Sequence, residues 1–174
     1  KNSRERLLFG NWEYDDDPNS LCSYDNILAV FSNDHVAKSP QKYIVADVAR
    51  FGSDAAVIGV WYGLVLVEVV RFEKSSIVDL QNCITELRVK HQVPIHRCIA
   101  DEDGVGGGLV DVLGIQGFVN NSKPKINPVS GLAENYYNFQ AQCAYMLASA
   151  INSFSIHIDC EISGDSRTQI IEEL

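Results

Sequence analysis

The stretch that decides the fold is Tyr43-Ile-Val-Ala-Asp47-Val-Ala-Arg50-Phe-Gly52-Ser-Asp54-Ala-Ala-Val-Ile-Gly-Val-Trp61. An apolar run ends in an aspartate, a short glycine-containing turn follows, and a second apolar run begins at once. Two such runs joined by a turn are typical of a β-hairpin. The pattern therefore predicts a hairpin whose first strand carries the Asp47 carboxylate to the edge of a sheet.

A second apolar run also ends in acidic residues. Ile95-His-Arg-Cys-Ile-Ala100 is followed by Asp101-Glu-Asp103 and then by the glycine-rich segment Gly104-Val-Gly-Gly-Gly108. Two strands that each end in carboxylates indicate a site for hard divalent cations, because carboxylate oxygens are the ligands such cations prefer. A site of this kind favours phosphodiester chemistry.

Composition places the chain among single-domain globular proteins. Its 174 residues are 46% hydrophobic and 21% charged, which is ordinary for a globular domain large enough to bury a core. No apolar run approaches the roughly 20 residues that span a bilayer, so no membrane partner is expected. The five cysteines form no CxxC pair, which fits a reducing compartment.

The formal net charge of -9 is unfavourable for binding a nucleic acid, because phosphate contacts normally require a basic surface. Bound cations would reverse the field locally. Small basic sets, which can form a local groove, are Lys38, Lys42, Arg50, Lys123 and Lys125. We therefore expect weak DNA binding by the chain alone and tight binding only with help from another domain or subunit.

Periodicity and turn residues predict a mixed α/β sheet flanked by helices. Strands are expected over 42–49, 55–62, 64–72 and 95–100, with short strands within 117–134 and near 154–158. Helices are expected over 24–34, 77–91, 109–113, 135–152 and from about 165 onward. The first three strands should be antiparallel neighbours. Residues 1–34 are expected to form an N-terminal arm with a short helix, and residues 35–174 the main domain.

This pattern resembles the ribonuclease H fold and, more narrowly, the nuclease domain of terminase large subunits, the DNA-packaging motors of tailed phages and prophages. The resemblance covers nearly the whole chain. It is carried by Arg6-Leu-Leu-Phe-Gly10-Asn-Trp12, Asp47-Val-Ala-Arg-Phe-Gly-Ser-Asp54, Asp101-Glu-Asp-Gly-Val-Gly-Gly-Gly-Leu-Val-Asp111, the run from Asn135 to Leu147, and Ile170-Ile-Glu-Glu-Leu174.

The resemblance implies an endonuclease that cuts concatemeric double-stranded DNA during genome packaging, with two Mg²⁺ or Mn²⁺ ions. It also implies an ATPase domain in the same full-length chain, a terminase small subunit and a portal protein as partners, and the cytoplasm of the bacterial host as location. No GxxxxGK[ST] loop of an ATPase domain is present. The family's third metal-binding aspartate is expected beyond Leu174, so the sequence is interpreted as a truncated piece whose active site is incomplete.

The resemblance assigns the catalytic and metal-binding roles first to Asp47 and Asp101. Asp47 is expected to bridge both ions, and Asp101 to bind one. Asp54 and Asp103 are candidates for further ligands, although Asp54 also suits a hairpin turn and Asp103 a helix cap. Candidate DNA contacts are Arg50, Lys123 and Lys125.

Two other functions remain open at this point. Actin-like and sugar-kinase-like ATPases share the ribonuclease H core, and their phosphate loop is a first hairpin beginning with an aspartate, but they need two such domains. Alternatively, the acids are remnants, and the domain docks onto a partner through the N-terminal arm and the loop 117–134. ATP binding by the isolated chain would favour the first alternative, and metal-independent association with another phage protein the second.

Overall fold

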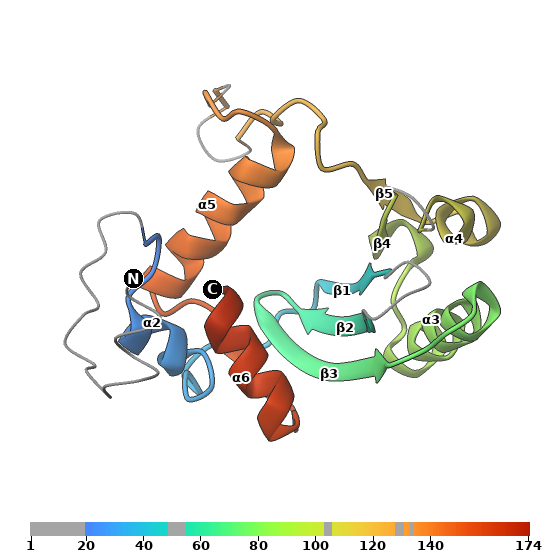
Figure 1. Cartoon of the computed structure of the whole chain (residues 1–174), viewed down its shortest axis with the longest axis horizontal. Helices are drawn as coiled ribbons and strands as arrows, with labels where there is room; N and C mark the ends of the chain where they lie inside the picture. Colours follow the sequence, from blue (N-terminus) through green and yellow to red (C-terminus); the bar gives the residue numbers. More distant parts are fainter. Residues whose placement is uncertain (1–19, 49–54, 103–105, 128–130, 133) are drawn as a thin grey trace.

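A six-stranded mixed sheet forms the centre of the molecule (Figure 1). The structure, a computed structural model, describes residues 20–48, 55–102, 106–127, 131–132 and 134–174. Its strands are β1 (Lys42–Asp47), β2 (Ala56–Tyr62), β3 (Val65–Phe72), β4 (Cys98–Asp101), β5 (Gln116–Phe118) and β6 (His157–Ile158). Their order across the sheet is β5-β4-β1-β2-β3-β6.

The hairpin predicted around the first aspartate is confirmed. β1 pairs antiparallel with β2, and β2 pairs antiparallel with β3. β4 joins the other edge of β1 in parallel, β5 continues in parallel, and β6 pairs in parallel with β3. The sheet thus combines three antiparallel strands with parallel additions, as the sequence predicted.

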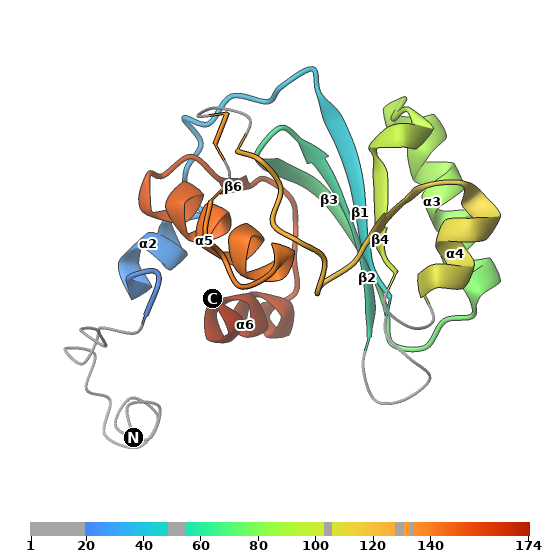
Figure 2. The ribbon, with the colours of Figure 1, turned by 90° about the horizontal axis from the view of Figure 1, so that it is seen from above.

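Helices cover both faces of the sheet, and Figure 2 shows the three layers. The helices are α2 (Tyr24–Ala29), α3 (Ile77–His91), α4 (Gly106–Leu113), α5 (Phe139–Asn152) and α6 (Gly164–Glu173). α3 and α4 lie on one side, whereas α5, α6 and α2 lie on the other. None of the helices within the described ranges is long and apolar enough to cross a membrane.

Local sequence signals explain where α3 begins and ends. The Ser76 side chain accepts a hydrogen bond from the Asp79 amide, and the Asp79 carboxylate accepts one from the Ser76 amide, which completes a capping box. The helix ends at Gln92, which adopts the left-handed conformation with φ 57°. Pro94 follows and prevents continuation. The predicted range of this helix is confirmed.

Three other boundaries differ from the sequence prediction. The strand expected over 95–100 begins only at Cys98, because Pro94 starts a 3₁₀ turn over Ile95–Arg97. α5 begins at Phe139 rather than at residue 135, since the Asn138 side chain accepts a hydrogen bond from the Ala141 amide and caps the helix there. The helix expected over 24–34 spans only Tyr24–Ala29.

Two separate apolar clusters stabilise the layers. The larger lies between the sheet and the helices α3 and α4, and includes the fully buried side chains of Ile44, Ile58 and Ile84. The smaller joins α2, α5 and the chain around β6 through Ile27, Ile151 and other residues. The described part of segment 1–34 therefore packs against the second cluster, and the domain boundary at residue 35 stays a prediction.

A polar network fixes the C-terminal end of α3 to the sheet. Glu68 on β3 accepts hydrogen bonds from Lys90 at 2.7 Å and lies 2.6 Å from His91 Nε2. The other ring nitrogen of His91 lies 3.0 Å from the Tyr62 hydroxyl on β2. Lys42 on β1 donates to the His91 carbonyl at 2.9 Å. Three strands and one helix end thus share a single cluster of hydrogen bonds.

Glu68→Gln should destabilise the protein at neutral pH by about 1 kcal/mol. The hydrogen bond from Lys90, together with that from His91, lowers the pKa of the Glu68 carboxyl in the folded state. A lowered folded-state pKa gives stability that is present above the unfolded-state pKa and is lost as pH falls through the folded-state pKa. Urea unfolding at pH 7 and at about pH 3 should therefore show a difference that shrinks on acidification.

The matched control for this prediction is Glu86→Gln, because Glu86 is an exposed glutamate on α3 with no ion pair among the residues that the structure describes. That variant should stay within about 0.5 kcal/mol of the wild type. A Glu68→Gln effect of equal size at both pH values would contradict the assigned origin of the stability.

Candidate metal centre

The structure brings Asp47 and Asp101 together at the ends of two neighbouring strands. β1 and β4 pair in parallel with Ala46 opposite Ala100. Asp47 follows Ala46 and Asp101 follows Ala100, and each aspartate is the last residue of its strand. Adjacent strands lie about 4.8 Å apart, so the two side chains start from neighbouring positions. Two segments that are far apart in the sequence thus meet at one sheet end.

Both carboxylates are carried on the same face of the sheet. Along β1, Ile44 and Ala46 are buried, whereas Val45 and Asp47 alternate with them and are exposed. Along β4, Cys98 and Ala100 are buried against the larger cluster. Because successive side chains in a strand point to opposite faces, Asp101 shares the face of Asp47. This face is the one opposite α3 and α4.

The glycine-rich segment has a steric role beside Asp101. α4 begins at Gly106, which is buried. A Cβ atom at this position would lie 1.7 Å from the Asp101 carbonyl oxygen. Only a residue without a side chain permits that approach. The segment therefore places the start of α4 directly against the backbone of the second aspartate.

Asp47 opens into a groove between the sheet and α6, with a volume of about 690 Å³. The groove floor is formed by β2 and β3, with Val57, Trp61 and Val69 among its residues. α6 supplies the opposite wall and contributes Glu173 from its last turn. The groove is thus mostly apolar and carries the carboxylates of Asp47 and Glu173 in its lining, while Asp101 ends the strand next to that of Asp47.

The electrostatics of the groove end favour a cation. Partial burial of Asp47 raises the pKa of its carboxyl, and the negative charges of Asp101 and Glu173 raise this pKa further. These causes all make the ionised form of Asp47 less stable than it is in water. A bound cation would offset all of them, because it supplies the opposite charge at the same point.

Glu173 is a candidate site residue that the sequence analysis missed. It shares one face of α6 with Ser166, Gln169 and Ile170, a spacing of three and four residues that is typical of a helix face packed on a neighbour. Arg71 on β3 donates hydrogen bonds to Ser166 and Gln169 and holds this face against the sheet. The spacing of these residues can be read from the sequence. The surface of the sheet against which this helix face packs cannot.

The remaining predicted acidic ligands, Asp54 and Asp103, lie outside the described residues, as does Arg50. Within the described ranges no group of three or more His, Cys, Asp or Glu side chains is close enough to hold a metal ion. The structure therefore brings Asp47 and Asp101 to neighbouring strand ends and places Glu173 in the groove that Asp47 lines. The metal-binding roles themselves stay predictions.

The predicted DNA-contacting lysines lie on the segment that connects β5 with α5. Lys123 and Lys125 are both exposed. The segment is held on α5 by Gln142, which is 2% exposed and exchanges two 2.8 Å hydrogen bonds with the backbone of Lys125. The Lys125 ammonium lies 4.6 Å from the centre of the Phe139 ring. The backbone of Lys125 is thus fixed to α5, and none of these contacts brings either lysine beside Asp47.

The strand order and the flanking helices define a ribonuclease H-like α/β fold. Among solved structures, the chain is similar to the nuclease domain of the large terminase subunit gp2 of bacterial virus Sf6. The structure compared is that of the K428A mutant of the Sf6 domain with manganese and β-thujaplicinol. The TM-score is 0.72 at 16% sequence identity, over 88% of this chain and 80% of that one. A calcium-containing structure of the same mutant gives the same values.

A second solved structure with this fold is the large terminase nuclease of the thermophilic phage G20c. It has a TM-score of 0.51 at 15% identity, over 82% of this chain and 79% of that one. No protein-family model and no curated protein sequence matches the chain. The fold suspected from the sequence is therefore confirmed: it is that of terminase large-subunit nuclease domains.

Proposed function

We propose that this domain is a metal-dependent endonuclease of the terminase large-subunit type, which cuts concatemeric double-stranded phage DNA during genome packaging. The observation that supports this function best is the pair Asp47 and Asp101, which end neighbouring parallel strands and share one face of the sheet. The fold shared with the Sf6 and G20c nuclease domains supports the same function.

The residues present fit Mg²⁺ or Mn²⁺. Both ions prefer carboxylate and water oxygens as ligands, and the candidate site offers the carboxylates of Asp47 and Asp101 from two neighbouring strands. Burial, together with the neighbouring charges of Asp101 and Glu173, raises the pKa of the Asp47 carboxyl, and a cation bound there would favour its ionised form. The structures of the Sf6 domain contain manganese or calcium, which agrees with an oxygen-ligand site in that protein.

The proposed mechanism divides the work between the ions and the chain. When bound, two divalent cations would lower the pKa of an attacking water and stabilise the charge that develops on the leaving oxygen. Asp47 and Asp101 would hold the ions from adjacent strands. Glu173, on the opposite wall of the groove, would orient water near them. Asp54 and Asp103 remain proposed additional ligands.

DNA would be contacted by Arg50, Lys123 and Lys125 in this proposal. The net charge of -9 argues that these contacts alone give weak binding. From the likeness to terminase nuclease domains, we also propose that the domain works with an ATPase domain of the same full-length protein, with the terminase small subunit and the portal protein as partners in the host cytoplasm.

Manganese should stabilise the wild-type domain, whereas Asp47→Asn should remove the stabilisation. A cation at 100 times its dissociation constant adds about 2.7 kcal/mol, which corresponds to a rise in melting temperature of about 5 °C or more. In the absence of metal, Asp47→Asn should be slightly more stable than the wild type at pH 7, because it removes a carboxylate whose ionised form is disfavoured in the fold. Differential scanning calorimetry with and without MnCl₂ measures both effects.

Asp111→Asn provides the matched control, since Asp111 is an exposed carboxylate on α4 outside the groove. It should keep the manganese response of the wild type. Equal manganese responses in Asp47→Asn and wild type would show that the cation binds elsewhere and would remove the main support for the proposal.

A further inference from the structure

The outer edge of β3 is left largely without a strand partner. β3 spans eight residues, Val65–Phe72. β6 pairs only with Val65 and Leu66. Over 67–72 no strand within the described part of the chain pairs with this edge. A free edge rich in valine presents backbone donors and acceptors that another extended segment can pair with.

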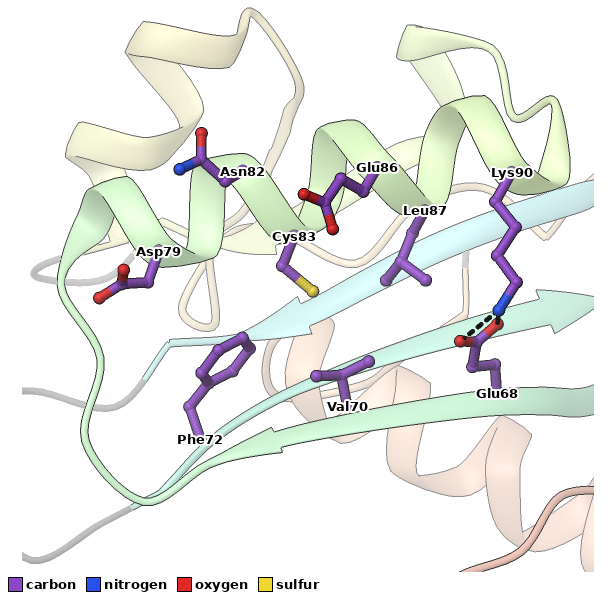
Figure 3. Close-up of a pocket in the computed structure, with 9 residues that line it drawn as sticks. All are labelled: Glu68, Val70, Phe72, Asp79, Asn82, Cys83, Glu86, Leu87 and Lys90. Atoms are coloured by element: carbon purple, nitrogen blue, oxygen red, sulfur yellow. Dashed lines mark hydrogen bonds and ion pairs between the residues drawn. The ribbon is translucent and has the colours of Figure 1, made fainter.

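A groove runs beside this edge, between β3 and α3, with a volume of about 500 Å³ (Figure 3). Val70 and Phe72 project from β3 and face Cys83 and Leu87 of α3. All four side chains belong to, or pack against, the larger apolar cluster. The groove therefore has an apolar floor that is continuous with the core, and a helix forms one of its walls.

The rim of the groove is acidic. Glu86 and Asp79 line it from α3, and Glu68 lines it from β3. The cation on the rim, Lys90, is already paired with Glu68 at 2.7 Å. Asp79 is occupied by hydrogen bonds from Ser76 but keeps its charge, because these bonds lower its pKa. An incoming segment thus meets apolar surface below and excess negative charge on the helix side.

We propose that this groove is a docking site for an extended peptide segment of a partner protein, which adds to the β3 edge as a seventh strand and carries both apolar and basic side chains at the alternate positions that face the groove. The proposal concerns a surface opposite the α6 groove and does not depend on nuclease chemistry. An edge strand beside a helix, with an apolar floor between them, is the arrangement that peptide-binding domains use for strand addition.

Dimensions and charge select this occupant. The six unpaired residues 67–72 extend over about 20 Å, which matches a peptide of about six residues. Side chains on every second position of that peptide would face the groove, where apolar groups cover Val70 and Phe72 and long basic ones reach Glu86 and Asp79. A second copy of this chain, paired edge to edge, would instead bring two acidic rims together, which disfavours it.

The proposal is tested with three synthetic probes: a capped Arg-Thr-Val-Thr-Arg-Thr-Val peptide (the Arg-Val peptide), whose arginines and valines share one face of the strand, the same peptide with glutamate in place of arginine (the Glu-Val peptide), and the Arg-Val peptide with proline in place of threonine (the proline peptide). Fluorescence anisotropy measures binding to the chain, and hydrogen exchange followed by NMR locates it. We expect the Arg-Val peptide to bind with a dissociation constant of about 10–100 μM. It should slow the exchange of amides within 67–72 at least about tenfold, without a matching effect on β4.

Two variants with the same reversal of charge sharpen the test. Glu86→Lys should weaken binding of the Arg-Val peptide by at least about fivefold. Asp34→Lys makes the same charge change in the exposed turn after α2 and should leave binding unchanged. Both positions are exposed, so both variants should fold, which circular dichroism verifies.

The results that would overturn the proposal are specific. Equal binding of the Glu-Val and Arg-Val peptides, or equal weakening by both charge reversals, would exclude recognition by the acidic rim. Full binding of the proline peptide, or protection outside β3, would exclude strand addition. Amide exchange within 67–72 could also slow without peptide as the protein concentration rises. That result would show that a second copy of the chain, rather than a partner peptide, pairs with the β3 edge.

Discussion

Asp47→Asn is expected to lower manganese-dependent DNA cleavage by at least about 10³-fold, in a chain that continues beyond Leu174, while leaving the fold intact. The amide keeps the size of the carboxyl group but loses the charge that would hold both cations. Asp101→Asn should have a similar effect, because Asp101 ends the adjacent strand on the same face. Conversion of supercoiled plasmid to linear DNA measures the loss.

Asp111→Asn should cut like the wild type in this assay, since its carboxylate is exposed on α4. Undiminished cleavage by Asp47→Asn would refute the assignment of the site. ATP binding by the chain, without cleavage by any variant, would favour the actin-like alternative. A catalytically silent chain that still binds a phage partner without metal would favour a docking module.

Gly106→Ala should destabilise the domain by about 3 kcal/mol, the largest effect on stability expected here for a change of one methyl group. The new Cβ would lie 1.7 Å from the Asp101 carbonyl oxygen and 2.9 Å from its carbonyl carbon. Both atoms belong to the backbone, so α4 and the end of β4 must move apart. Urea unfolding measures the loss, and the manganese response should fall because Asp101 is displaced.

The control for this change lies two residues further along the same helix. At Gly108 a Cβ would meet Ile77 Cδ1 at 3.5 Å, which is an ordinary contact. Gly108→Ala should therefore stabilise the protein by about 0.5–1 kcal/mol, because alanine favours a helix more than glycine does. Similar losses in both variants would mean that the helix tolerates no side chain there, and that the approach to Asp101 is not the cause.

The elements that local patterns determine were predictable from the sequence. Alternation of side chains and the turn residues gave the hairpin around Asp47, and the Ser76 cap with Pro94 gave the bounds of α3. Boundaries failed where a single side chain decides them. Asn138 caps α5 four residues later than expected, and Pro94 converts the start of the 95–100 strand into a 3₁₀ turn.

The candidate site was predictable as far as strand pairing determines it. The parallel pairing of β1 with β4 places Asp47 beside Asp101, in agreement with the expectation that both lie at strand ends. Glu173 was not predictable, because its place depends on how α6 docks. That docking combines the hydrogen bonds from Arg71 to Ser166 and Gln169 with the packing of Ile171 on the smaller apolar cluster, and no recognisable motif announces these contacts.

The parallel pairing of β1 with β4 also has a kinetic consequence. More than fifty residues separate Asp47 from Asp101, and β2, β3 and α3 lie between β1 and β4 in the chain. Non-local pairing of this kind forms late, because chain closure costs entropy before any contact compensates it. A nascent or partly folded chain, even with its first hairpin complete, would therefore have no assembled cutting site. In the proposed nuclease, folding itself would therefore delay DNA cleavage until both aspartates are in place.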